Sequence, residues 1–178
     1  GLSGMGQGCS HSSTAIYTTG GFQQPPGANA YVDTIQYCPF ATNMDSSDAG
    51  EIGTGTNSNL GRATSGSKIF VVGGVTNPAG SAVGDIYHFP TATSGITGSD
   101  SGAEMATSSG FWDGSVGSDN ANAHVYYHNS PSSLERFSMG ITTGTATDVG
   151  EFSPGKNSSC GSGSDTEWGV AGGGNSSV

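Results

Sequence analysis

The chain has 178 residues, of which 32 are glycine, and only 32% of its residues are hydrophobic. Disordered chains are usually rich in charge and poor in aromatics, but here charged residues make up 10% and seven Phe, six Tyr and two Trp are present, so a turn-dense all-β domain is favoured instead. The net charge of −10 with only four basic residues excludes the positive footprint that nucleic acid and anionic membranes require, so we expect neither as a partner.

Four short strand candidates occupy the first fifty residues. A small polar strand is predicted over 8–13 and a second over 15–19, ending at Gly20 and Gly21, where a double glycine lets the chain reverse with positive φ. A third strand is predicted over 35–40. The fourth starts with Asp48 in an Asp-x-Gly sequence, and we expect its carboxylate to accept local backbone N–H groups.

The next fifty residues repeat this order. A polar strand over 60–64 precedes the most apolar short run of the chain, 68–72, which is β-branched or aromatic and too short for a helix. Gly73 and Gly74 are expected to end that strand in a turn. A strand over 84–90 follows, and then a second Asp-x-Gly sequence that begins at Asp100.

The rest of the chain holds a third copy and half of a fourth. Strands are predicted over 110–115, 123–127 and 134–139, followed by a third Asp-x-Gly sequence at Asp148. The half copy contains strands over 158–162 and 167–171, the second ended by Gly172 and Gly173.

Two markers give the same period. The apolar positions Ile35, Ile86 and Leu134 lie 51 and 48 residues apart, and the three aspartates lie 52 and 48 residues apart. The sequence therefore predicts a single domain, 1–178, of about three and a half four-stranded repeats with approximate bounds 8–52, 53–105, 106–152 and 153–178. A lone sheet this poor in apolar residues cannot bury enough surface, so we expect neighbouring sheets to stack face to face, as propeller blades do.

The motifs that carry these repeats resemble those of a known family. A strand ending in Gly-Gly, followed by a strand of the form Ile-x-x-Phe-Pro, is similar to kelch-type β-propeller repeats. The variant D-T-I-Q-Y-C-P-F-A-T at 33–42, followed by D-x-G-E, resembles kelch-like repeats in structural and tail-associated proteins of marine cyanobacterial phages. The resemblance covers nearly the whole chain, implies a virion or extracellular structural or host-contact role, and transfers no catalytic residue.

Three and a half blades are fewer than the ~4 to 8 of a closed propeller. We therefore expect the ring to be completed by another copy, a partner chain or a missing segment, with other virion subunits or copies of the chain as partners. Because the chain begins at Gly1, we expect it to be trimmed or to come from a larger polypeptide.

Aromatic residues outside the repeated positions are the candidate contact residues. Such side chains in loops commonly contact carbohydrate or protein, and packing between blades is the alternative explanation. They support a second hypothesis, a lectin-like propeller that recognises a bacterial surface glycan, and the candidates are Phe22, Phe111, Trp112, Tyr126 and Trp168.

The sequence supplies no recognisable catalytic or metal site. Of the four histidines, His11, His88, His124 and His128, the last two would share a face of a strand, but a third metal ligand is lacking nearby, and no Gly-x-Ser-x-Gly nucleophile motif occurs. Three cysteines without C-x-x-C spacing give neither a disulfide framework nor a zinc site. The repetition of Asp48, Asp100 and Asp148 indicates a structural role, so we expect a non-enzymatic protein without metal or cofactor.

Overall fold

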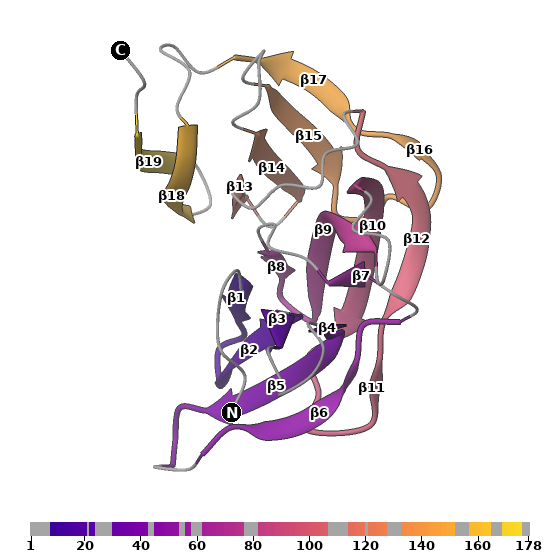
Figure 1. Cartoon of the computed structure of the whole chain (residues 1–178), viewed down its shortest axis with the longest axis vertical. Coiled ribbons are helices and arrows are strands. Elements are labelled where there is room, and N and C mark those ends of the chain that lie inside the picture. Colours follow the sequence, from indigo (N-terminus) through magenta and orange to yellow (C-terminus); the bar gives the residue numbers. More distant parts are fainter. Residues whose placement is uncertain are drawn as a thin grey trace.

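The structure is a computed structural model of the chain. It describes residues 8–20, 22–23, 30–42, 45–53, 56–57, 62–76, 82–106, 114–119, 121–127, 133–151, 157–164 and 169–175. These residues form nineteen strands in an all-β fold (Figure 1). No helix that could cross a membrane occurs among them.

Three consecutive units each contain a four-stranded antiparallel meander, and we call them modules 1, 2 and 3. Module 1 consists of β1 (Gly8–His11), β2 (Ala15–Thr19), β5 (Thr34–Pro39) and β6 (Ser47–Glu51), in that order. A small hairpin of β3 (Phe22–Gln23) and β4 (Ala30–Tyr31) lies between β2 and β5 in the chain.

Module 2 repeats the order of module 1. It consists of β8 (Arg62–Ser65), β9 (Lys68–Thr76), β10 (Ala82–Pro90) and β12 (Ser99–Glu104), and the short β7 (Thr56–Asn57) also pairs with β9. The two-residue strand β11 (Ile96–Thr97) precedes β12 and joins the sheet of module 1 instead of its own.

Module 3 consists of β13 (Gly114–Ser118), β14 (Asn122–Tyr127), β15 (Leu134–Ser138) and β17 (Thr147–Gly150). The short β16 (Gly144–Thr145) precedes β17 and pairs with β12 of module 2. A final hairpin, β18 (Asn157–Ser164) with β19 (Gly169–Asn175), corresponds to the first half of another module.

The strands of the repeated pattern are present; β13 is described from Gly114, and the first part of its predicted range, 110–113, lies outside the described residues. The role of the glycine pairs differs from the expectation. Gly20 does end β2, with φ of 67°, whereas Gly21 lies outside the described residues. Gly73 and Gly74 lie inside β9, and Gly172 and Gly173 lie inside β19.

At Gly73 and Gly74 strand β9 does not turn but passes a β-bulge in its partner strand β10. Val83 pairs with Gly74 and Ile86 pairs with Val72, so two residues of β10 oppose Gly73 alone. Opposite this bulge the two glycines have φ of 61° and 125°, values that favour glycine. The strand therefore continues to Thr76.

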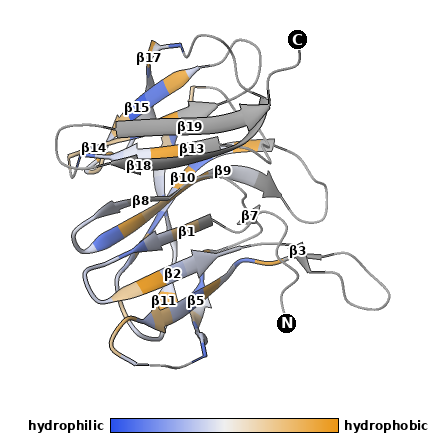
Figure 2. Ribbon diagram, turned by 90° about the vertical axis from the view of Figure 1, so that its left-hand side faces the viewer, coloured by the Kyte–Doolittle hydropathy of each residue, from blue (hydrophilic) through white to orange (hydrophobic). Residues whose placement is uncertain are grey.

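The apolar run of β9 is shared between two hydrophobic clusters. Ile69 and Val71 pack in one cluster with residues of module 1, such as Tyr17 and Ile35. The alternate residues, Phe70 and Val72, pack in the other with residues of module 3. Neighbouring sheets thus bury their apolar rows against each other, as expected, and Figure 2 shows the strands of successive modules stacked in layers.

The first strands of the modules contact one another along the inner side of the stack. The Ser10 hydroxyl on β1 hydrogen-bonds the Thr64 hydroxyl on β8, and the Ser118 hydroxyl on β13 donates to the Thr64 carbonyl at 3.2 Å. The last strands, β6, β12 and β17, lie on the opposite margin (Figure 1). Each module therefore has a polar inner strand and an outer edge strand.

Candidate functional site

The most regular feature of the structure is the outer edge strand of each module. The Asp side chain of each Asp-x-Gly sequence accepts the backbone N–H of the glycine, at 2.9 Å for Asp48, 2.8 Å for Asp100 and 3.0 Å for Asp148. The glycines have φ of 142°, 75° and 152°, which favour glycine. The pairing register shifts beside each sequence, so the Asp-x-Gly unit is a bulge within the edge strand.

The edge strand of module 1 binds the backbone of module 2, and we call this contact seam 1. Strand β11 pairs in parallel with β6, with Ile96 opposite Gly50 and Thr97 opposite Glu51. The Gly98 amide donates to the Glu51 carbonyl at 2.8 Å. A Cβ on Gly50 would overlap the Ile96 backbone, and one on Gly98 would overlap the Ile52 carbonyl. The close approach of these two backbone segments therefore requires both glycines.

Module 2 binds module 3 in the same way, in seam 2. Strand β16 pairs in parallel with β12, with Thr145 opposite Glu104. The Ala146 amide donates to the Glu104 carbonyl at 2.8 Å, so Ala146 takes the place of Gly98. A Cβ on Gly102 would lie 2.9 Å from the Thr142 carbonyl oxygen. The two seams use one backbone arrangement with different side chains.

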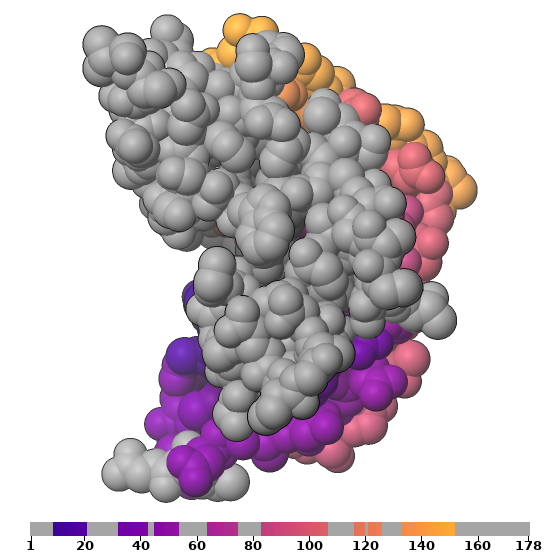
Figure 3. All heavy atoms as spheres, viewed as in Figure 1, coloured from indigo at the N-terminus to yellow at the C-terminus, as the bar shows by residue number. Residues whose placement is uncertain are grey.

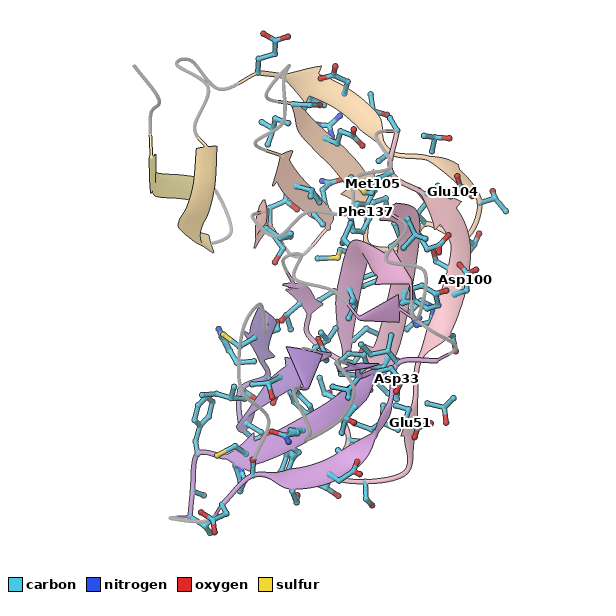
Figure 4. The ribbon with its side chains drawn as sticks, in the orientation of Figure 1. Asp33, Glu51, Asp100, Glu104, Met105 and Phe137 are labelled. Atoms are coloured by element: carbon cyan, nitrogen blue, oxygen red, sulfur yellow. The ribbon has the colours of Figure 1, made fainter. Side chains whose placement is uncertain are left out.

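Acidic side chains follow the edge strands along the outer margin of the molecule. Figure 4 places Glu51, Asp100 and Glu104 on this margin, whereas Met105 and Phe137 lie between modules 2 and 3. Atoms of the outer strands form the right-hand margin in Figure 3. Asp85 lies directly opposite Glu104, and its pKa is raised, first by burial and then by the charges of Asp100 and Glu104. These carboxylates therefore repel one another.

A buried carboxylate reinforces seam 2. Glu135 on β15 is completely buried, and its Oε2 atom accepts the Ala106 amide at 2.7 Å, just beyond β12. Gln36 occupies the corresponding position of module 1, because Gln36 opposes Asp48 as Glu135 opposes Asp148. The Gln36 side chain is only partly buried and accepts the Ser46 hydroxyl at 3.3 Å. Across seam 1 the counterpart of Glu135 is Tyr87 of module 2, which opposes Asp100 and whose ring lies close to Gly53 of module 1.

The histidines do not assemble a site within the described residues. His124 Nε2 lies 3.6 Å from Asp119 Oδ2, and Asp119 also accepts the amides of Ala121 and Asn122. These interactions, led by the Asn122 amide, lower the pKa of Asp119 to about 2. The ring of His88 packs on Phe70 with centroids 5.7 Å apart, and burial, followed by Lys68, lowers its pKa.

Asp119 forms a local turn, because its carboxylate holds the β13–β14 connection much as the Ser12 hydroxyl holds the β1–β2 connection. Where side chains are described, no three His, Cys, Asp or Glu residues gather as a possible metal site.

The candidate aromatic residues cannot be placed as a surface. Phe111, Trp112 and Trp168 lie outside the described residues, as does His128. Phe22 and Tyr126 lie on β3 and β14, but their side chains are outside the description. The glycan-binding hypothesis therefore stays a prediction.

Sequence reasoning missed the two seams, although a signal was present. Thr97 and Thr145 each stand three residues before the aspartate of an Asp-x-Gly sequence, and both lie opposite a glutamate in the structure. What this arrangement can do chemically is bind an extended backbone by parallel strand pairing. No protein-family model matches the chain, and no curated protein matches it.

Proposed function

We propose that the chain is a non-enzymatic structural domain of a phage particle, a tail, fibre or capsid-surface component built of kelch-like propeller blades. Its modules serve as blades, with β1, β8 and β13 toward the axis and β6, β12 and β17 at the rim. The single observation that carries the proposal is the repeated backbone seam, at Ile96–Thr97 on β6 and at Gly144–Thr145 on β12. A contact that is formed by backbone hydrogen bonds suits the assembly of repeated units, because the side chains of the paired strands can differ from one unit to the next.

The phage assignment rests on the resemblance of the 33–42 and Asp-x-Gly-Glu motifs to phage repeats, and the seams make those motifs an assembly device. The acidic outer margin supports a role at the particle surface, because net negative charge favours solubility. The partners in this proposal are other virion subunits or further copies of the chain.

Quantitative mass spectrometry of purified particles of the phage that encodes this chain tests the proposal. A structural component is expected at a constant copy number relative to the major capsid protein across preparations, and it should stay bound in high salt because backbone pairing is poorly screened. Absence from the particles contradicts the proposal. Saturable glycan binding by the isolated chain that disappears on Trp112→Ala or Trp168→Ala, with Phe40→Ala as a control, would favour the lectin-like alternative.

A further inference from the structure

The edge strand of module 3 has the features of the two edges that bind a neighbouring module. Asp148 accepts the Gly150 amide, β17 pairs with β15 through the same register shift, and the sequence continues with Glu151, as Gly50 continues with Glu51. Within the described part of the chain, β15 is the strand that pairs with β17, and no strand pairs with its other side.

The space beside this edge is open. A Cβ on Gly50 would overlap the Ile96 backbone, whereas one on Gly150 would meet no described atom within 4 Å. The φ of 152° at Gly150 by itself favours glycine, so a glycine is expected there with or without a neighbouring strand. The volume that module 2 fills beside module 1 is thus unfilled by described residues beside module 3.

Exposure of the central residue of the Asp-x-Gly sequence points the same way. Ala49 is 2% exposed and belongs to the hydrophobic cluster that contains Ile96 of the next module, and Ser101 is 7% exposed. Val149 occupies the same position in module 3 and is 40% exposed. An apolar side chain lies in water where its two counterparts are covered, which marks the position of a further module.

The chemistry of the occupant follows from the two seams. In both, an uncharged residue and then threonine lie beside the edge, and the threonine is opposite a glutamate: Thr97 faces Glu51, and Thr145 faces Glu104. In module 1 the residue three before the aspartate is Asp45, which would face Glu151 if a second copy docked head to tail. Like charges directly opposite each other are destabilising, so the first module of a second copy is a poor occupant.

We propose that the edge 147–151 is a docking strand for a further repeat module, which it binds in parallel through an uncharged, extended segment of Ile-Thr-Gly type. Ile96 to Gly98 is the example of that segment in this chain. This inference does not depend on the virion role, because it concerns only how one module binds the next.

A peptide with the sequence of residues 93–99 probes the edge directly. Titrated into the ¹⁵N-labelled full chain, it is expected to shift the amide resonances of Val149, Gly150 and Glu151 in a saturable way. The same peptide with aspartate in place of Thr97 should bind more weakly, by about fivefold at the upper end of a cross-strand charge effect. Unchanged resonances of the three residues at millimolar peptide would overturn the proposal.

A variant that supplies the segment within a second copy gives an independent measurement. Asp45→Thr combined with Ser46→Gly provides module 1 with the Thr-Gly pair of module 2, and we expect sedimentation velocity to show association about fivefold stronger than that of the wild-type chain. Adding Val149→Asp, at an exposed position, should abolish the gain, whereas adding Phe40→Asp, at another exposed apolar residue, should not. Association no stronger than wild type, or association that survives Val149→Asp, would overturn the proposal.

Discussion

The two seams achieve the same backbone contact in different ways. Seam 1 depends on the absence of side chains at Gly50 and Gly98. The two backbone segments lie so close there that a Cβ on either glycine would overlap the opposite backbone. Seam 2 accommodates the Ala146 methyl group and adds the buried Glu135 contact to the Ala106 amide. Both seams contain a hydrogen bond of 2.8 Å from a backbone amide of the next module to the backbone carbonyl of a glutamate, Glu51 in seam 1 and Glu104 in seam 2. The backbone hydrogen bond therefore defines the contact, and the side chains set how near the two backbone segments lie to each other.

The largest effect is expected where seam 1 is closest. Gly98→Ala places a methyl group on the Ile52 carbonyl and should lower the free energy of unfolding by about 3 kcal/mol, the upper end for overpacking. The reverse change in seam 2, Ala146→Gly, should cost only about 1 kcal/mol. Urea denaturation measures both. Equal losses would show that the two seams do not differ in closeness.

The Glu135 hydrogen bond in seam 2 is expected to give the next largest effect. Glu135→Ala removes the acceptor of the Ala106 amide and should cost about 1–3 kcal/mol. Gln36→Ala at the corresponding position of module 1 should stay within about 0.5 kcal/mol, since that side chain does not bridge modules in the structure. Thermal unfolding of the two variants provides the comparison, and a Gln36 variant as damaged as the Glu135 variant would contradict it.

Charge on the edge of module 2 can be made to match that of module 1. Thr34 faces Glu51, whereas Asp85 faces Glu104, so Asp85→Thr should stabilise the chain at pH 7 by about 0.5 kcal/mol. The reverse change, Thr34→Asp, should destabilise it by a similar amount.

The advantage of Asp85→Thr should depend on pH. The folded-state pKa of Asp85 is raised, so the wild-type chain loses stability as the pH rises from the ordinary aspartate pKa, ~4, through that raised value. The difference between the variant and the wild type should therefore disappear below about pH 4. Melting curves at pH 7 and pH 3.5 measure it, and a constant difference would mean that repulsion of Asp85 is not the cause.

The Asp-x-Gly bulges are expected to give effects between those of Glu135→Ala and Asp85→Thr. Asp48→Ala and Asp148→Ala each remove one local hydrogen bond and should cost about 1 kcal/mol. Asp100→Ala should cost less, because it also removes a charge that acts on Asp85. A double variant of Asp100→Ala with Asp85→Thr should show this coupling, and strict additivity of the two free-energy changes would argue against it.

The sequence was sufficient for the period of the chain and for most strands. Spacing between Ile35, Ile86 and Leu134 placed three strands that occupy equivalent positions in their modules. The Asp-x-Gly sequences made the backbone hydrogen bonds expected of them. These features are local, so a pattern of a few residues specifies them.

The remaining features depend on neighbours that a local pattern does not contain. A glycine with positive φ can end a strand or lie opposite a bulge, and only the register of β10 distinguishes these at Gly73. The two-residue strands β11 and β16 carry no hydrophobic periodicity, because their pairing is through the backbone. The burial of Glu135 was also not readable, since Gln36 is partly buried at the equivalent position.

Strand β9 has a consequence for how the molecule melts. Its even-numbered and odd-numbered residues belong to different hydrophobic clusters, so loosening this one strand opens both at once. Calorimetry should therefore record one shared transition for the three modules instead of a stepwise loss, as in other arrays whose units are coupled through nearest neighbours.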